Sequence, residues 1–215
     1  ERDNPGICEI NTFRGNKISS MSRNLKEEGD DIFIRYNEAI PILRKVKLKK
    51  EPSFSRLVSA QKPFGFRTYY KGKNEQFEGA VTLYGNKSIE FVSREEVTQN
   101  DGWIDRHKVY ITMAYGAGED FPHQILNKPI YWGINTCCTE TYILIGPFEN
   151  LNITQNVISY IGTKFFRFLV SVIKISQDAT QRVYKFVPMQ DFSKPWTDEE
   201  LYAKYGLTDE EIAFI

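Results

Sequence analysis

The sequence predicts an α/β (α+β) fold in which a mixed, twisted sheet packs against one long core helix. Three observations predict it. Short runs rich in aromatic and β-branched residues recur between turn signals, which is typical of strands. One stretch, residues 154–175, carries apolar side chains at steps of three and four, the period of an amphipathic helix. Two Thr-x-x-Glu sequences near the end have the form of helix-capping boxes.

The N-terminal half is expected to begin with a strand. Residues 7–13 alternate like a strand that completes the sheet of a preceding domain, and residues 15–29 have the composition of a polar loop. Asn37 is expected to cap a helix over residues 38–49, with Pro41 tolerated in its first turn. Three further segments are predicted to be strands: residues 64–70, 81–84 and 88–92.

The C-terminal half begins with a strand at residues 108–113. It runs into an irregular loop longer than most structureless connections, which indicates function or disorder. A buried strand at residues 139–145 then precedes the core helix. A closing strand is expected at residues 183–187, and short helices are expected after Thr197 and Thr208.

The composition is that of an ordinary globular protein, with 41% hydrophobic and 26% charged residues. No apolar run approaches the ~20 residues of a membrane span, so we expect a soluble protein without a membrane partner. The cysteine usage indicates a reducing, cytoplasmic compartment. The three cysteines have no disulfide or zinc spacing, and we expect Cys137 and Cys138 to be small buried residues at a strand entry. Because the chain begins at Glu1 without a methionine and stops at Ile215 inside an expected helix, we expect a piece of a longer protein.

The net charge of zero hides an asymmetry along the chain. Residues 44–73 hold ten basic side chains and one acid, Glu51. Residues 190–215 hold seven acids against Lys194 and Lys204. This distribution indicates that one face binds a polyanion and that another face binds something else.

Motifs for catalysis do not occur in the sequence. Adenine methylation needs an (Asn/Asp)-Pro-Pro-aromatic loop around the flipped base, and the chain has no Pro-Pro pair. Gly116 and Gly118 follow a strand, but Glu119 and Asp120 place acid where a phosphate would sit, so we expect a tight loop that shapes a contact surface. The acid-x-Lys element typical of magnesium nucleases is also missing. We therefore expect no catalytic residue, metal site or bound cofactor in this chain.

With catalytic motifs missing, the remaining candidate residues are those suited to binding nucleic acid. Residues 62–71 interleave cations, aromatic rings and hydroxyls, the mixture that holds phosphates and packs on bases or sugars. On the long loop, Gln124 would make a bidentate contact to adenine worth ~1–3 kcal/mol of discrimination. The expected DNA-binding residues are Lys62, Arg67, Thr68, Tyr69, Lys71, Tyr115, Gly116, Gly118, His123, Gln124, Lys128 and Thr139.

Each of these residues also has a simpler interpretation. Residues 62–71 fit an edge strand with a solvated lysine face. His123 and Gln124 fit hydrogen bonds that hold the long loop together, and Thr139 fits an ordinary strand threonine. The sequence alone leaves these alternatives open.

Seven motifs lie in order along the chain: Asp31-Ile-Phe-Ile-Arg-Tyr-Asn37, Lys62-Pro-Phe-Gly65, Tyr115-Gly-Ala-Gly118, Phe121-Pro-His-Gln-Ile-Leu-Asn-Lys128, Cys137-Cys-Thr-Glu-Thr-Tyr142, Thr163-Lys-Phe-Phe-Arg-Phe-Leu169 and Val187-Pro-Met-Gln-Asp-Phe192. Together they resemble the target-recognition domain of adenine-specific DNA methyltransferases from bacterial restriction-modification systems. The last motif resembles the strand-and-proline element that ends recognition domains in type I specificity subunits.

The resemblance implies that residues 30–215 form a DNA target-recognition domain and that residues 1–29 are the tail of a preceding catalytic domain. It implies a parent chain that is a site-specific, adenine-specific DNA methyltransferase, with or without a fused endonuclease. That catalytic domain would bind S-adenosylmethionine and flip the adenine. The implied partners are double-stranded DNA and the chain's own catalytic domain.

Two alternatives come from other functional classes. A protein-interaction module would dock its acidic end, residues 196–215, on a partner subunit and leave its basic end solvated. A divergent metal-dependent nuclease would cut DNA in the presence of magnesium. Salt-dependent binding to duplex DNA separates the recognition domain from the docking module, and cleavage would identify the nuclease.

Overall fold

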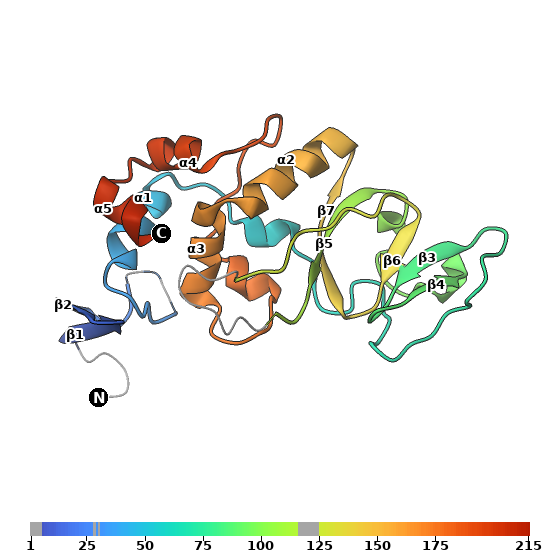
Figure 1. Ribbon diagram of the computed structural model, residues 1–215, viewed down its shortest axis with the longest axis horizontal. Helices are drawn as coiled ribbons and strands as arrows, with labels where there is room; N and C mark the ends of the chain where they lie inside the picture. Colours follow the sequence, from blue (N-terminus) through green and yellow to red (C-terminus); the bar gives the residue numbers. More distant parts are fainter. Residues whose placement is uncertain (1–5, 28, 30, 116–124) are drawn as a thin grey trace.

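A computed structural model describes residues 6–27, 29, 31–115 and 125–215. The chain has a mixed α/β fold with small sheets and several helices (Figure 1). The strands are β1 (Ile7–Arg14), β2 (Lys17–Asn24), β3 (Val81–Tyr84), β4 (Ile89–Val92), β5 (His107–Thr112), β6 (Thr136–Cys138) and β7 (Tyr142–Phe148). The helices are α1 (Ala39–Leu48), α2 (Leu151–Gly162), α3 (Lys164–Ile173), α4 (Asp198–Tyr205) and α5 (Asp209–Phe214). The molecule is elongated, with β1 and β2 at one end of its long axis and β3 and β4 at the other.

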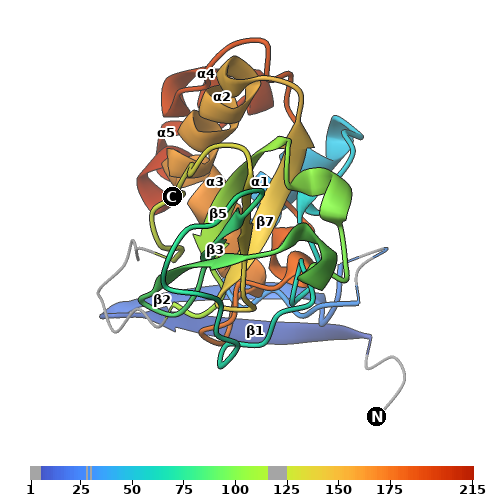
Figure 2. The ribbon, with the colours of Figure 1, turned by 90° about the vertical axis from the view of Figure 1, so that its right-hand side faces the viewer.

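The antiparallel pair of β5 and β7 lies between two hydrophobic cores. Val109 and Ile145, which pair across the two strands, face the larger core together with residues of α1, α2 and α3. The neighbouring pair, Tyr110 and Leu144, faces a smaller core that β3, β4 and β6 complete. Successive side chains point to opposite faces of a strand, so both faces of this pair are buried. Figure 2 shows β5 and β7 side by side, with β3 nearer the viewer and the helices above and behind.

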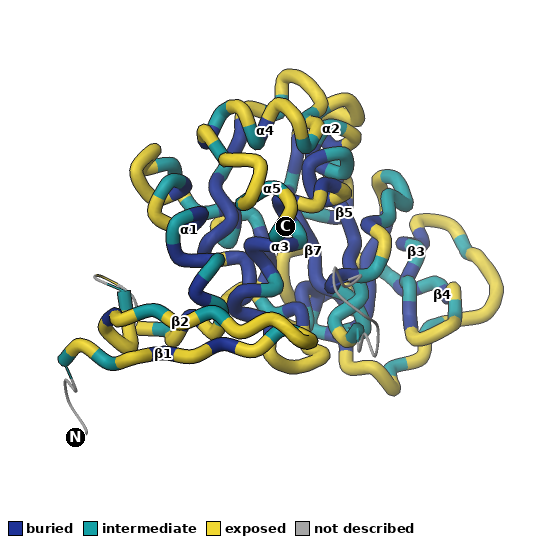
Figure 3. Tube along the Cα trace, turned by 60° about the vertical axis from the view of Figure 1, so that its left-hand side comes forward, coloured by how far each residue is buried: buried dark blue, intermediate teal, exposed yellow. Residues whose placement is uncertain are grey.

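The strands expected at residues 81–84, 88–92 and 108–113 are confirmed as β3, β4 and β5. In place of one mixed sheet, the described residues form three small ones: β1–β2, β4–β3–β6 and β5–β7. β3 is antiparallel to β4 and parallel to β6, so the middle sheet is mixed as expected. The β4–β3–β6 and β5–β7 sheets are held together by the two cores, and the β1–β2 sheet contributes to neither. Figure 3 shows the most continuous burial along α3, β5 and β7.

The single helix expected over residues 154–175 is wrong, because α2 and α3 meet at a bend of 66°. Thr163 has an extended backbone between them and caps both helices. Its hydroxyl accepts the Phe166 N–H at 3.1 Å and donates to the Tyr160 carbonyl at 2.8 Å. Both helices still turn their apolar side chains into the larger core, which explains why the periodicity continues across the break. Among the described residues no single helix is long and apolar enough to span a membrane; only this bent pair, taken together, has the length and composition.

Two other expected strands differ from the structure. Residues 183–187 do not form a strand; they follow and overlap a 3₁₀ turn at Gln181–Tyr184. Val183, Tyr184, Phe186 and Val187 are all buried in the larger core, where the 3₁₀ turn packs against α3. The strand expected at residues 139–145 begins later, because residues 139–142 form a turn closed by the Tyr142 N–H on the Thr139 carbonyl at 3.2 Å.

The expected strand at residues 7–13 is confirmed as β1, but its partner lies in the segment expected to be a loop. β2 pairs with it antiparallel as a hairpin, which is largely exposed (Figure 3). Asn37 does not cap α1. Its side-chain amide donates to the carbonyls of Ile10 at 2.8 Å and Ser19 at 3.0 Å, and its oxygen accepts from Arg23 at 3.0 Å. Asn37 is fully buried and therefore ties the hairpin to the chain before α1.

The helices expected after Thr197 and Thr208 are confirmed as α4 and α5, each with a capping box. The Thr197 hydroxyl accepts the Glu200 N–H at 3.3 Å, and the Glu200 carboxylate accepts the Thr197 N–H at 3.1 Å. α4 ends at Gly206, whose φ of 62° is the left-handed conformation that glycine adopts without strain.

Candidate nucleic-acid interface

Residues 62–73, called segment 62–73 below, form an irregular stretch, so the strand expected at residues 64–70 is wrong. Phe64 is fully buried in the smaller core. The Asn100 amide donates to the Pro63 carbonyl at 2.6 Å. Gly65 has a φ of +91° and lies so close to Thr98 that a Cβ would be 2.0 Å from its hydroxyl oxygen. Only glycine fits this position, which fixes the segment against the loop before β5.

A tight turn in this segment is closed by the Tyr70 N–H on the Arg67 carbonyl at 3.0 Å. Glu140, in the loop before β7, holds the turn from one side. Its carboxylate accepts the Thr68 N–H at 3.1 Å, and its own N–H donates to the Phe66 carbonyl at 2.9 Å. The Tyr70 ring packs on the Phe66 ring, with 4.4 Å between centroids. Hydrogen bonds and ring packing therefore fix the turn on both sides.

Acidic side chains hold the rest of the segment. Tyr70 donates its hydroxyl to Glu96, and burial together with this hydrogen bond raises the pKa of Tyr70 to about 12. Glu90, buried in β4, accepts the Gly72 N–H at 2.5 Å and the Lys71 ammonium at 3.2 Å. Burial raises the pKa of Glu90, but these two bonds and a further one from Ser88 together outweigh it and leave the pKa below its ordinary value. Glu90 therefore stays ionised and fixes the end of segment 62–73.

The side chains left on the surface of segment 62–73 belong to the expected DNA contacts. Arg67, Thr68, Tyr69 and Lys71 are exposed, and Tyr69 reaches 81% exposure. The Arg67 and Lys71 side chains remain 55% and 68% exposed although they pair with Glu140 and Glu90. Ion pairs with an exposed cation contribute little to stability, so a phosphate can compete for both cations. Lys62 is half-buried.

The ten cations of residues 44–73 do not share one surface. Those of α1 lie near the hairpin end of the molecule, whereas segment 62–73 contacts β4 at the other end (Figure 1). The acidic C-terminal stretch packs beside α1, and Glu211 of α5 pairs with Lys45 of α1 at 2.6 Å, which partly neutralises the basic charge there. The expected separation into a basic and an acidic face is therefore wrong near α1. The cations of segment 62–73 lie at the other end of the molecule, away from the acidic C-terminal stretch.

Thr139, an expected DNA contact, is fully buried. Its hydroxyl donates to Thr141 at 2.9 Å, and its N–H donates to the Tyr84 carbonyl at 3.1 Å. The simpler interpretation of this threonine as a structural residue agrees with the structure. Thr139 contributes indirectly, because it shapes the turn that presents Glu140 to segment 62–73.

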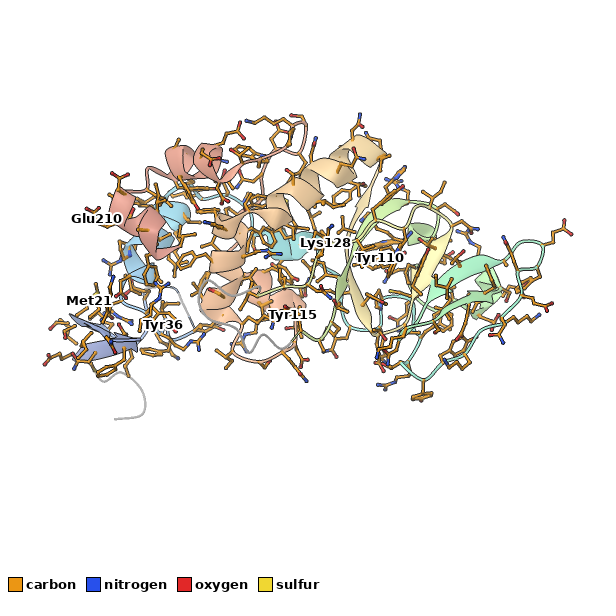
Figure 4. All side chains as sticks on the ribbon, viewed as in Figure 1. Met21, Tyr36, Tyr110, Tyr115, Lys128 and Glu210 are labelled. Atoms are coloured by element: carbon orange, nitrogen blue, oxygen red, sulfur yellow. The ribbon has the colours of Figure 1, made fainter. Side chains whose placement is uncertain are left out.

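Two of the expected loop contacts, Tyr115 and Lys128, lie on either side of the segment that the structure does not describe. Tyr115 and Lys128 lie in the middle of the molecule (Figure 4). The Tyr115 N–H donates to the Gln177 carbonyl at 2.8 Å, and its carbonyl accepts from Lys174 at 2.9 Å. Lys128 is exposed. Gly116, Gly118, His123 and Gln124 lie outside the described residues.

Cys137 and Cys138 are buried in β6, as expected, and burial raises the pKa of the Cys137 thiol to about 12. Beside them lies Lys108, a fully buried cation that the sequence analysis did not single out. Its ammonium donates to the carbonyls of Ile104 and Arg106, each at 3.1 Å. Burial lowers the pKa of Lys108 from 10.5 to about 8. This group belongs to the smaller core and not to the exposed surface.

The acids that hold segment 62–73 were not predicted from the sequence. Glu140 bonds to Thr68 across 72 residues of chain, a distance at which no periodicity or spacing carries a signal. Glu90 did leave a signal in the sequence, because it stands between Ile89 and Phe91 in an expected strand. A charged residue in such a place needs a partner, since its burial without one would be costly.

Among the described residues, no group of three or more His, Cys, Asp or Glu side chains is arranged to hold a metal ion. Comparison of the chain with models of known protein families, with curated proteins and with solved structures found no match. The chemistry of the interface is therefore read from its own side chains. Exposed cations, a hydroxyl and a phenol ring are groups that bind phosphate, sugar and base.

Proposed function

We propose that this chain is a sequence-specific recognition module for double-stranded DNA. It would serve an adenine methyltransferase of a restriction-modification system, in which a separate catalytic domain binds S-adenosylmethionine and transfers the methyl group. The observation that carries the proposal is segment 62–73, an irregular backbone held rigid from several sides with Arg67, Thr68, Tyr69 and Lys71 exposed. A surface ordered before binding loses less entropy when its partner arrives. The assignment to a restriction-modification system rests on the seven sequence motifs, which resemble those of its recognition domains.

In this proposal the exposed groups divide the work of binding. Arg67 and Lys71 contact phosphates, which position the module without reading sequence. The Thr68 hydroxyl adds a phosphate or sugar contact at the corner of the turn. Base reading is assigned to the long loop, where Gln124→Ala or His123→Ala is expected to relax the preference at one base pair by ~1–3 kcal/mol.

The test measures binding to a pool of randomised duplexes at increasing salt, followed by sequencing of the retained DNA. Replacing Lys62, Arg67 and Lys71 together by alanine should weaken binding to all sequences and reduce the salt slope by roughly 0.9 per lost phosphate contact. The matched control replaces Lys47, Lys49 and Lys50, which removes the same charge from the α1 end of the molecule. The control should retain the wild-type slope.

Other outcomes of the same assay contradict the proposal in distinct ways. If only the control variant loses the slope, the phosphate contacts lie at α1 and segment 62–73 is not the interface. Failure of the wild-type chain to retain any duplex at low salt would overturn the function and favour the subunit-docking module. Magnesium-dependent cleavage of the pool would favour the nuclease.

A further inference from the structure

We infer that Tyr69 is a stacking residue, whose ring packs on the face of a base in the bound duplex. The inference rests on the proposed function and assigns one chemical role within it. It starts from exposure: the Tyr69 side chain is 81% exposed, whereas Tyr70 beside it is half-buried and packed on Phe66. No ring contact or hydrogen bond joins the Tyr69 side chain to another described residue. An aromatic ring left in water is a surface available for a partner.

Tyr69 lies at the corner of the turn in segment 62–73, where its ring projects into solvent. The turn closed by Tyr70 on Arg67 places Thr68 and Tyr69 at its corner. Glu140 holds the backbone immediately before the ring through Thr68, and the Tyr70–Phe66 packing holds the backbone immediately after it. The ring therefore projects from a fixed backbone, so little chain entropy is lost when it contacts a ligand.

The surrounding charges favour a nucleic-acid ligand for this ring. Arg67 stands two residues before Tyr69 and Lys71 two residues after it, and both cations are exposed. A ring between two cations fits a partner whose flat apolar groups lie between anionic ones, as bases lie between phosphates. Glu140 and Glu90 pair with the two cations and hold them on either side of the turn.

Stacking on a base inside a duplex requires that the base be separated from its neighbour. The required unstacking costs least where a base is missing, damaged or unpaired. A stacking residue therefore gives the protein a preference for duplexes with such a defect, and a residue that only contacts phosphate or sugar gives none. This difference supplies a readout that does not depend on the recognised sequence.

The experiment uses short labelled duplexes of one sequence, one intact and the others with a single abasic site moved one position at a time. Wild type should bind the duplex with the best-placed abasic site more tightly than the intact one. Tyr69→Phe should keep this preference, and Tyr69→Ala should lose it and bind the intact duplex about tenfold more weakly, within the range measured for loss of one stacked base. Phe13→Ala, at an exposed ring on the hairpin, is the control and should behave as wild type.

The outcomes separate the inference from the proposed function. Wild-type binding with an unchanged preference in Tyr69→Ala would overturn the stacking role and leave DNA recognition standing. A loss in Tyr69→Phe as large as that in Tyr69→Ala would assign the contact to the hydroxyl and also overturn stacking. No binding of wild type to any duplex would overturn the proposed function, and the inference with it. Because Tyr69 is exposed, all its variants should melt as wild type does.

Discussion

The carboxylate of Asp198, at the start of α4, accepts the backbone N–H of Phe165 in the first turn of α3 at 2.9 Å. It also accepts the Lys164 N–H at 3.0 Å. These amides belong to the first turn of a helix, where N–H groups have no partner within the helix. The negative charge also lies at the positive end of the α3 dipole. The Asp198 side chain therefore caps the start of α3 after the bend and holds α4 against α3.

We predict that Asp198→Ala lowers the free energy of unfolding by about 1–2 kcal/mol, because two amides of α3 lose their acceptor. Asp198→Asn keeps an acceptor oxygen and should lose less. Asp209→Ala is the control, since Asp209 occupies the same position in α5 after its own capping threonine. Urea denaturation followed by circular dichroism measures the three variants. Equal losses in Asp198→Ala and Asp209→Ala would contradict a role between helices.

The buried Lys108 is expected to make the folded protein more stable as the pH becomes alkaline. Burial lowers its pKa to about 8 from 10.5, so the unfolded chain binds this proton more readily than the folded protein. The cost of burying the charge is present in full below pH 8 and is relieved as the pH rises from 8 towards 10.5, by on the order of 3 kcal/mol. In Lys108→Met that rise should disappear. Denaturation at pH 7 and at pH 9 measures the first pH unit of this rise, about 1 kcal/mol. Parallel curves for variant and wild type would refute the assignment.

Glu90 is expected to cause a loss of stability in acid. Its bonds to Gly72 and Lys71 hold its pKa below the ordinary 4.5, so this stabilisation is complete above pH 4.5 and is lost as the pH falls through the folded pKa. Glu90→Gln should reduce stability at pH 7 by about 1–3 kcal/mol and flatten the acid limb. Hydrogen exchange of the Gly72 amide reports the local effect. An acid limb unchanged in the variant would assign the loss to other carboxylates.

We predict that Asn37 is a main attachment of the β1–β2 hairpin, beside the buried Arg23, which donates to the Ile34 carbonyl at 2.5 Å. An isolated two-stranded hairpin is marginally stable in water, and Asn37 supplies three of its hydrogen bonds to the rest of the chain. Asn37→Ala should expose β1 and β2 to limited proteolysis and speed their amide exchange, while β5 and β7 keep their protection. Asn11→Ala, at an exposed hairpin position, is the control. Equal protection of the hairpin in Asn37→Ala and wild type would show that other contacts hold it.

The sequence was sufficient where the signal is local. α1 appears with Pro41 in its first turn, α4 and α5 begin at their predicted capping boxes, and β3 has its predicted bounds. In the candidate interface, Arg67, Thr68, Tyr69 and Lys71 are exposed, as residues chosen for polar contacts should be, but the strand expected around them is an irregular turn. These features depend on residues within a few positions of one another, so a single sequence carries them.

Only the tertiary structure decided what depends on residues far apart in the chain. The apolar period of residues 154–175 continues through Thr163, so the bend could not be inferred from it, and Asp198 holds the second helix from another part of the fold. Asn37 has the form of a cap but bonds to the hairpin, and Thr139 has the form of a strand threonine but is buried in a turn. Segment 62–73 is held by several distant side chains, among them Glu140, which bonds to Thr68 across 72 residues. Such contacts are selected by the packing of whole elements, whose free energy is shared among many side chains and leaves no pattern in any one stretch of sequence.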